Sequence, residues 1–394
     1  MYNRVLKYKL ILIFLFIGIL CYPADANEFD PVSADFPGEV ADDYEEILLE
    51  EEYESQHPIK KNLFADIKSV NENRAVDLIS PHGLQLEGSI VKSIKFGTIF
   101  DQSINFIDIS GDNYATNYNV SAVDVFLDTH YADGKTTSRI MYNFVRDLNG
   151  YDNHFTEKIS EFFVSHNLND NQRFFAGISP RLPIGEEGAY SIMRLDFANR
   201  SQIARNYSNI RALGVRNQGM YKYASYDIGF YDSTRFLENP FEGSEFVGWV
   251  NFTPLADISE KTGNLTIGTG YNTGRRDYSY SVLGAYIGYT YKKLHLNFEY
   301  ANANGHNGVY NNPAKSEGFY SSVLYDVHPK VQIGCRYDYF NPDKSMHSDT
   351  ITEYTAGITY LLKRNLKVML NYVFQNREAS SDLSRLLILM RYSF

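Results

Sequence analysis

The chain has 394 residues, a formal net charge of -11 at pH 7, 44% hydrophobic residues and 15% aromatic residues, with 32 Tyr against one Trp. Its mean hydropathy of -0.34 is ordinary for a water-soluble protein, and after residue 20 no stretch is apolar enough for a membrane helix. This excludes a helical membrane protein but not a β-barrel, whose strands reveal their membrane character only as alternation.

The amino terminus has the pattern of a secretory signal peptide. Basic residues, an apolar run and a small-x-small cleavage site follow one another at Arg4, Lys7, Lys9, residues 10–20 and Ala24-Asp25-Ala26. The run is shorter than the roughly 20 residues of a membrane anchor, and Leu20 before Cys21 does not suit a lipoprotein. We predict a signal peptide over residues 1–26. Its cleavage would leave Cys335 as the remaining cysteine, without an intrachain disulfide.

Residues 27–83 are predicted to form an acidic periplasmic segment. Residues 28–54 hold twelve Asp and Glu and no Lys or Arg. Without this stretch and the signal peptide, 34 Lys and Arg stand against 35 Asp and Glu, so the acidity belongs to the segment and not to the body. We favour a solvated acidic run over a short helix, which the spacing of Val40, Tyr44 and Ile47 would also allow.

From residue 84 onward, segments of alternating polar and apolar residues recur between Gly, Asn, Asp, Pro and Lys. We predict an all-β fold, a transmembrane antiparallel β-barrel of about sixteen strands over residues 84–394. The expected strands are 84–98, 117–130, 136–147, 155–166, 173–179, 209–217, 221–232, 244–253, 264–272, 278–291, 294–303, 317–327, 331–340, 351–362, 366–375 and 384–394.

The connections between these strands alternate in length. Tight turns at 133–134, 292–293, 328–330 and 363–365 each join an even-numbered strand to the next odd one. Asp133-Gly134 is typical of a two-residue hairpin, because Gly adopts the positive φ that such a turn needs. Long connections such as 304–315 follow odd-numbered strands. Outer-membrane barrels have short periplasmic turns and longer extracellular loops, so the pattern favours a barrel over a soluble β-sandwich.

Alternation also predicts which side chains face lipid. Outward sets are Leu366, Val368, Leu370, Tyr372 and Phe374, then Val331, Ile333, Cys335, Tyr337 and Tyr339, and in the last strand Leu386, Ile388, Met390, Tyr392 and Phe394. Arg385 and Arg391 fall on the other face. An Arg facing lipid at the midplane costs roughly 2–4 kcal/mol, so we place these charges in a water-filled lumen.

The terminal Phe394 resembles the signal that outer-membrane proteins present to the barrel assembly machinery. We therefore expect that machinery and outer-membrane lipid as partners, and the outer membrane as location.

The longest connection, residues 180–208, is rich in arginine. With the strand after it, it carries Arg181, Arg194, Arg200, Arg205, Arg211 and Arg216, against the loop acids Glu186, Glu187 and Asp196. Surplus guanidinium groups at a constriction would concentrate anions and exclude cations. Their planar fork suits phosphate. For any single Arg an ion pair with a nearby carboxylate is the simpler interpretation, while for the cluster as a whole we favour selectivity.

Several segments resemble the phosphate-selective porin O and P family. They are Gly177-Ile178-Ser179-Pro180-Arg181-Leu182-Pro183-Ile184-Gly185, Leu195-Asp196-Phe197-Ala198-Asn199-Arg200-Ser201, Arg211-Ala212-Leu213-Gly214-Val215-Arg216, and residues 336–343 with the strands after them. Asn199 departs from the acid usual in the family. The resemblance implies a homotrimeric, sixteen-stranded porin. In porins a long third loop folds into the lumen and narrows it. Here it would place the six Arg at the constriction, with small anions such as phosphate as solutes.

Other functions receive less support from the sequence. A general or carbohydrate porin is the alternative, because Tyr and Phe are abundant enough to line a sugar path. A purely structural barrel would differ in not conducting. We find no spacing of the nine His that suggests a metal site, no phosphate-binding loop and no Ser-His or paired-acid grouping. We expect no enzyme activity, no catalytic residues, no metal, no cofactor and no nucleic-acid partner.

Overall fold

The computed structural model describes residues 84–85, 90–109, 114–145, 159–180, 185–189, 191–208, 211–233, 243–275, 278–305, 314–346, 349–363, 365–378 and 380–393. The predicted signal peptide, residues 27–83, Arg181 and Phe394 lie outside this range. None of the described helices has the length and apolarity needed to cross a membrane.

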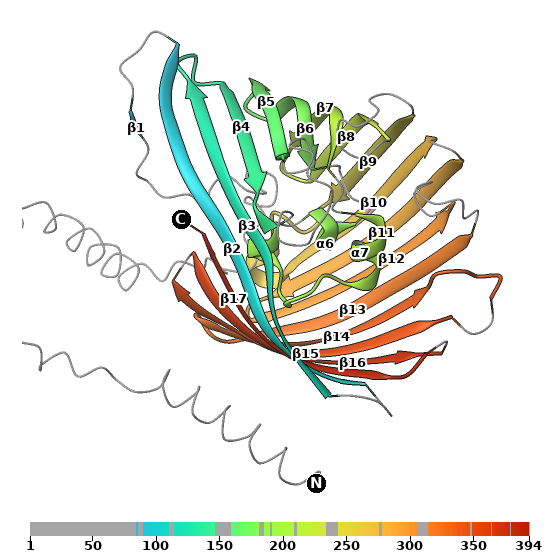
Figure 1. Cartoon of the computed structure of the whole chain (residues 1–394). Coiled ribbons are helices and arrows are strands. Elements are labelled where there is room, and N and C mark those ends of the chain that lie inside the picture. Colours follow the sequence, from blue (N-terminus) through green and yellow to red (C-terminus); the bar gives the residue numbers. More distant parts are fainter. Residues whose placement is uncertain are drawn as a thin grey trace, which may run out of the picture. The chain divides into compact units, whose positions relative to one another are not determined.

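The described strands belong to one antiparallel sheet (Figure 1). They are β1 (Leu84–Gln85), β2 (Val91–Ile109), β3 (Tyr114–Tyr131), β4 (Thr136–Asn143), β5 (Ile159–Asn169), β6 (Gln172–Pro180), β7 (Arg211–Met220), β8 (Ala224–Asp232), β9 (Ser244–Phe252), β10 (Asn264–Arg275), β11 (Ser279–Tyr291), β12 (Leu294–Asn304), β13 (Lys315–His328), β14 (Val331–Asn341), β15 (Ile351–Lys363), β16 (Leu366–Arg377) and β17 (Leu383–Ser393).

The sheet closes on itself. The last strand, β17, pairs with β2 from Ser393 opposite Ile99 to Leu383 opposite Ile109. The circle is continuous on the other side because β9 pairs with β10. The two residues of β1 add a short pairing on β2. Strands β2 to β17 therefore form a closed sixteen-stranded antiparallel barrel, and the predicted fold class is confirmed.

Most predicted strand bounds agree with the structure to within a few residues, but the first strand does not. We expected it over 84–98, whereas β2 continues to Ile109. Its second half has Asp101, Ser103 and Asn105 buried on the inner face. Ile104 and Phe106 alternate with these residues on the outer face, so this half has the same period of two as the other strands. Both ladders of β2 run along this half, to β3 as far as Asp108 and to β17 as far as Ile109, so the predicted end at residue 98 was too early.

The tight turns lie where the sequence predicts them. Lys292 has φ 52° in the two-residue β11–β12 connection, as a primed turn requires. The β3–β4 connection is longer than the predicted two residues and spans 132–135, with Gly134 at φ 67° donating its N–H to the carbonyl oxygen of Tyr131 at 3.1 Å. Asp133 accepts hydrogen bonds from the backbone N–H groups of Lys135 and Thr136 at 2.9 and 2.8 Å. The β9–β10 connection is longer and contains α8 (Ser259–Thr262).

Side chains alternate between an exposed outer face and a buried inner face. On β11, Leu283 and Ile287 are 53% and 50% exposed, whereas Val282 is fully buried. Cys335 is exposed on the outer face of β14, as predicted. Its neighbour Arg336, on the inner face, is 3% exposed. Apolar residues therefore cover the outside of the barrel, and charged and polar residues line its inside.

Candidate functional site

The long connection between β6 and β7 carries three short helices, α6 (Glu186–Ala189), η1 (Ile192–Arg194) and α7 (Gln202–Tyr207). Ser201 precedes α7 and caps it, since its side chain accepts a hydrogen bond from the backbone N–H of Ala204. We call residues 185–208 the arginine loop. Its described residues contact inner-face side chains of β11 to β17.

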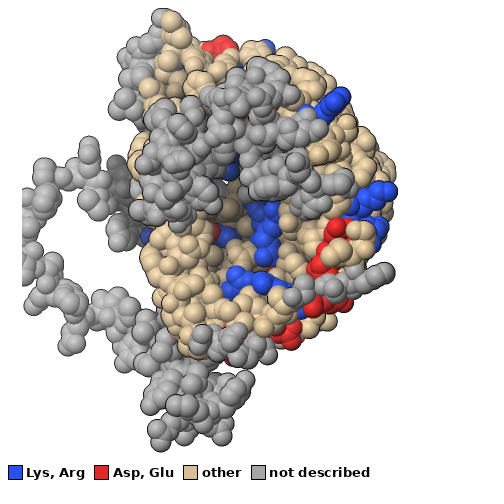
Figure 2. All heavy atoms as spheres, turned by 45° about the vertical axis from the view of Figure 1, so that its right-hand side comes forward, with Lys and Arg blue, Asp and Glu red and all other residues tan. Residues whose placement is uncertain are grey.

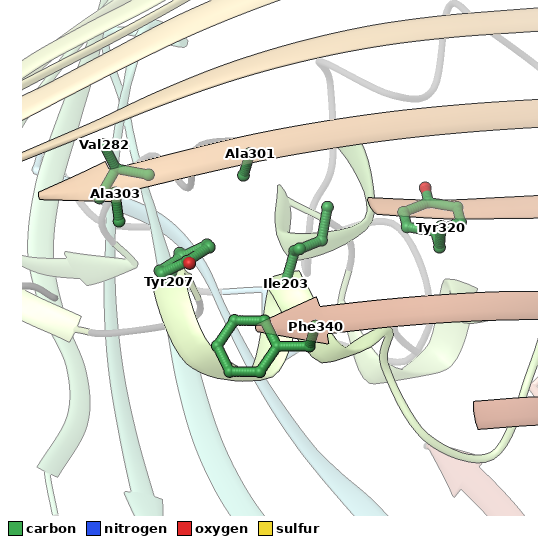
Figure 3. Close-up of a cluster of buried hydrophobic side chains, with 7 residues drawn as sticks. All are labelled: Ile203, Tyr207, Val282, Ala301, Ala303, Tyr320 and Phe340. Atoms are coloured by element: carbon green, nitrogen blue, oxygen red, sulfur yellow. The ribbon is translucent and has the colours of Figure 1, made fainter. Parts of the chain in front are cut away.

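Apolar packing fixes the second half of the arginine loop. Figure 3 shows Ile203 and Tyr207 of α7 among inner-face side chains of four strands, namely Val282, Ala301, Ala303, Tyr320 and Phe340. One wall residue beside Ile203 is a glycine: a Cβ on Gly318 would lie 2.7 Å from Ile203 Cγ2. Tyr207 also shares a 2.7 Å hydrogen bond with Ser316. Burying a side chain of this size stabilises the contact by roughly 1.5–3 kcal/mol.

Cationic and amide side chains of the barrel wall form hydrogen bonds with backbone groups in the first half of the loop. Arg391 on β17 donates to the carbonyl oxygens of Ile192 and Ala198 at 2.9 and 2.6 Å. Asn371 on β16 accepts from the N–H of Ala198 at 2.5 Å. The contacts to Ala198 pair its N–H and its carbonyl oxygen, which lie outside regular secondary structure, so they fix the path of the loop as well as its position.

An apolar patch on the inner face lies beside these polar contacts. The sequence analysis named only polar and charged residues for the inner face and did not mention this patch. It consists of Ala198, Met369, Val373, Leu387 and Leu389. Leu387 and Leu389 fall on the same face of β17 as Arg391 and are each 3% exposed. They are not in water because the loop covers them.

The first predicted arginines of the loop lie in different surroundings. Arg194 ends η1 and is partly exposed. Arg200 is 8% exposed and donates to the carbonyl oxygen of Glu187. Burial lowers the pKa of Arg200 to about 10, although the carboxylate of Glu187 opposes this shift. The carboxylate of Glu187 accepts hydrogen bonds from Arg336 Nη1 at 2.9 Å and from the N–H of Ser201 at 2.6 Å. Arg200 is thus part of the attachment of the loop.

The remaining predicted arginines divide between exposed and enclosed positions. Arg205 on α7 lies 3.0 Å from Glu353, and its side chain is 32% exposed. Arg211 lies 3.6 Å from Glu161 and is 21% exposed. Arg216, by contrast, pairs with Asp227 and is 5% exposed. The side chains of Arg205 and Arg211 are thus partly exposed to solvent, whereas the side chain of Arg216 is buried in the barrel wall.

Two further arginines lie near Arg205. They are Arg377 on β16 and Arg385 on β17. The positive charges of Arg205 and Arg377 both act on Arg385, which lies beside Glu353 as well. Arg377 Nε donates to Gln375 at 2.6 Å. Arg385 Nε has no hydrogen-bond partner among the described residues. Alternation had placed Arg385 on the inner face, but no sequence pattern connects it with a loop about 180 residues away.

The carboxylates of the inner wall are withdrawn from water, whereas several guanidinium groups are not. The acids Asp101, Asp124, Asp128, Glu161, Asp227, Glu245, Glu299, Asp326, Asp338 and Glu353 are all at most 7% exposed. Arg205, Arg211, Arg377 and Arg385 are partly exposed. Figure 2 looks into a hollow whose wall carries Lys and Arg side chains, while Asp and Glu gather along one rim. Water in the described lumen therefore meets more positive than negative charge.

The comparison with protein families covers the second half of the barrel. Residues 250–394 match the model of the phosphate-selective porin O and P family. The predicted resemblance is confirmed over these residues, which include the strands after residue 336. The matched range does not include residues 177–216. A comparison with curated proteins finds no match.

Solved porin structures have the same fold. An anion-selective porin from Comamonas acidovorans has a TM-score of 0.52 at 12% identity, covering 77% of this chain and 99% of that one. OmpT of Vibrio cholerae in its trimer form has a TM-score of 0.50 at 13% identity, covering 76% and 99%. OprB of Pseudomonas putida has a TM-score of 0.57 at 10% identity, covering 76% and 94%.

Family match and fold together support an outer-membrane porin, a channel rather than an enzyme, located in the outer membrane as predicted.

Proposed function

We propose that this porin conducts small anions by passive diffusion and that the arginine loop narrows the passage beside Arg205, Arg211, Arg377 and Arg385. One observation carries the proposal: every inner-face carboxylate named above is buried, while these four arginines are at least partly exposed. Exposed cations raise the local concentration of anions and repel cations. Buried acids with ion-pair partners contribute little to the field in the water-filled part.

The same cluster supports phosphate as one of the solutes. Arg205 lies 3.0 Å from Glu353, and the charges of Glu353, Arg205 and Arg377 all act on Arg385. The planar groups of these arginines can each donate two parallel hydrogen bonds to an oxyanion. Unlike chloride, phosphate can accept such bonds from several arginines at once. A porin without anion specificity is the second candidate. Its support is the number of inner-wall arginines, including Arg216 and Arg336, that are neutralised by carboxylates.

Reversal potentials under a KCl gradient in planar bilayers test the proposal. The wild-type channel is expected to prefer anions. The double variant Arg377→Gln/Arg385→Gln should lose much of this preference, because it removes two of the exposed cations. Arg275→Gln is the matched control, since Arg275 is exposed on the outer face at the same end of the barrel. A wild-type preference for cations would overturn the proposal. Equal permeability would favour the second candidate.

Phosphate is tested by adding it to channels that conduct chloride. We expect phosphate to reduce the chloride current in the wild type and to reduce it less in the double variant. A chloride current that phosphate leaves unchanged would remove phosphate from the proposed solutes and leave the general anion preference intact.

We also propose a homotrimer. The support is the likeness to OmpT of Vibrio cholerae, whose structure is described as a trimer form. The mass of the detergent-solubilised protein distinguishes one copy from three.

A further inference from the structure

Aromatic side chains form a continuous patch on the outer face of strands β12 to β16, which are neighbours in the sheet (Figure 1). Strand pairing places Phe298, Tyr337, Tyr354 and Phe374 in one row across these strands. The ring of Phe319 lies beside this row, with its centroid 5.8 Å from the centroids of Phe298 and Tyr337. The centroids of Tyr337 and Tyr354 are 5.2 Å apart. We call these five residues the aromatic platform.

Two lysines lie beside the aromatic platform, at the end of the barrel that has the long connections. Lys315 is the first residue of β13 and is on the same outer face as Phe319, four residues along the strand. Lys344 follows β14, and its backbone N–H donates to the carbonyl oxygen of Lys315 at 2.8 Å. Both lysines are exposed. Outer-membrane barrels have their tight turns at the periplasmic side, so these lysines belong to the external side of the membrane.

One of the two ammonium groups has a carboxylate partner and the other does not. Lys344 Nζ donates to Glu317 at 2.7 Å. Lys315 makes no ion pair with a described residue. Two amide side chains of β12 lie next to these charges: Asn302 Nδ2 is 3.4 Å from the same Glu317 oxygen, and the exposed Asn304 is opposite Lys315 in the ladder. The edge of the platform therefore offers positive charge together with neutral hydrogen-bonding groups.

We propose that the aromatic platform and these two lysines bind a phosphorylated glycolipid of the outer leaflet. Lys315 and Lys344 attract its phosphate, as basic side chains at a membrane surface attract anionic headgroups. Asn302 and Asn304 bind its sugar hydroxyls, and the rings pack against its acyl chains. The three kinds of side chain follow one another from the external end toward the middle of the membrane, in the same order as phosphate, sugar and acyl chain follow one another in such a lipid.

This combination of groups distinguishes a glycolipid from simpler anions. Free phosphate would use the ammonium groups of Lys315 and Lys344 but would leave the rings without a role. An anionic phospholipid has a phosphate and acyl chains, but it lacks the sugar that the two asparagines suit. Aromatic residues lie at the headgroup level of membranes, which is where a bound lipid meets them. The inference goes beyond anion conduction, because all of these side chains are outside the lumen.

The test is native mass spectrometry of the complete protein in detergent, with bisphosphorylated lipid A as the probe. The wild type should bind this glycolipid. Lys315→Gln/Lys344→Gln should bind it more weakly, by roughly fivefold for each lysine removed. Lys292→Gln/Lys293→Gln is the matched control, since it removes the same charge from an exposed tight turn at the other end of the barrel and should bind like the wild type.

Two further measurements separate the parts of the site. Lipid A without phosphate groups should bind the wild type and the lysine double variant equally. Phe319→Leu removes the central ring and keeps an apolar side chain, so it should weaken the binding of both forms of lipid A. Phe252→Leu is its control, because Phe252 is 49% exposed on the outer face at the tight-turn end of β9.

Three results would overturn the inference. The first is binding of bisphosphorylated lipid A by Lys315→Gln/Lys344→Gln as tight as in the wild type, or as weak in the Lys292 and Lys293 control. The second is displacement of the glycolipid by inorganic phosphate, since the lysines would then serve a free anion. The third is a fall in the mass of the protein assembly in the lysine double variant, which would make this face a contact between copies. Reversal potentials test anion conduction separately, and this variant should leave them unchanged.

Discussion

Arg205 Nη2 lies 3.0 Å from each of the two carboxylate oxygens of Glu353. The contact joins α7 of the arginine loop to the wall at β15. Glu353 is 1% exposed and also accepts from Gln202 and Gln375. The carboxylate therefore orients Arg205 and at the same time offsets part of its charge.

Replacing Glu353 by Gln should increase the preference for anions. The change removes one negative charge beside Arg205, Arg377 and Arg385, and at this range the effect on permeability is roughly two- to threefold. The reversal potential measures it. Glu317→Gln is the control, because Glu317 lies on the outer face and pairs with Lys344. A preference that stays the same or falls would mean that Glu353 serves only to hold the loop.

Replacing Arg391 by Met should loosen the first half of the arginine loop. The variant loses the contacts to two loop carbonyls and leaves Asp101, 2% exposed, without its partner at 2.5 Å. An unpaired buried charge costs roughly 3–5 kcal/mol. We expect a lower temperature for unfolding in detergent and a larger, noisier single-channel current.

The double variant Asp101→Asn/Arg391→Met separates these two effects. It removes the unpaired charge, so stability should recover in part while the current stays noisy. If the current becomes as quiet as in the wild type, the carbonyl contacts of Arg391 do not hold the loop.

The sequence predicted the barrel well because its strands obey two local constraints. Lipid outside and water inside impose a period of two, and a tight turn demands residues such as Gly134 that accept positive φ. Both constraints act on residues that are close together in the sequence, so they can be recognised without the structure. The predicted end of the first strand at residue 98 was wrong: residues 99–109 keep the period of two and pair with both β3 and β17.

The candidate site was predictable only in part. The loop arginines stand close together in sequence, and alternation placed Arg385 inside. Whether each guanidinium is enclosed, as Arg216 is, or reaches water, as Arg205 does, depends on the strand beside it. Arg377 was missed because the predicted strand ended at residue 375, whereas β16 continues to Arg377. Leu387 and Leu389 were also unexpected on the inner face, because an apolar inner patch makes sense only with the loop packed on it.

Replacing Gly357 by Ala should displace the arginine loop. The new Cβ would lie 2.2 Å from Asn371 Nδ2 and 3.2 Å from Phe197, and Asn371 holds the N–H of Ala198. Overpacking of this kind typically costs roughly 1–3 kcal/mol. Gly248→Ala is the matched control, since the nearest atom to its Cβ is 3.6 Å away. Hydrogen exchange of residues 192–200 should become faster in the first variant only, and equal exchange in both would contradict the tight fit.

Acidification should tighten the attachment of the arginine loop through Asp196. Burial raises the pKa of Asp196 to about 6, although Lys367, His295 and Arg336 favour its charged form. The attached state then binds more protons than the released one between the ordinary pKa of about 4 and about 6. Attachment therefore weakens as pH rises through this window, by roughly 1–3 kcal/mol in total.

Asp196→Asn should remove this pH dependence. Its amide cannot ionise, so at pH 7 residues 192–198 should exchange their amide hydrogens more slowly than in the wild type. The difference should diminish from pH 6 to pH 4, where the wild-type carboxyl becomes neutral as well. Asp343→Asn, on an exposed loop at the other side of β14, should exchange like the wild type. If Asp196→Asn exchanges faster at pH 7, the charged carboxylate stabilises the loop, and acidification would loosen the attachment instead of tightening it.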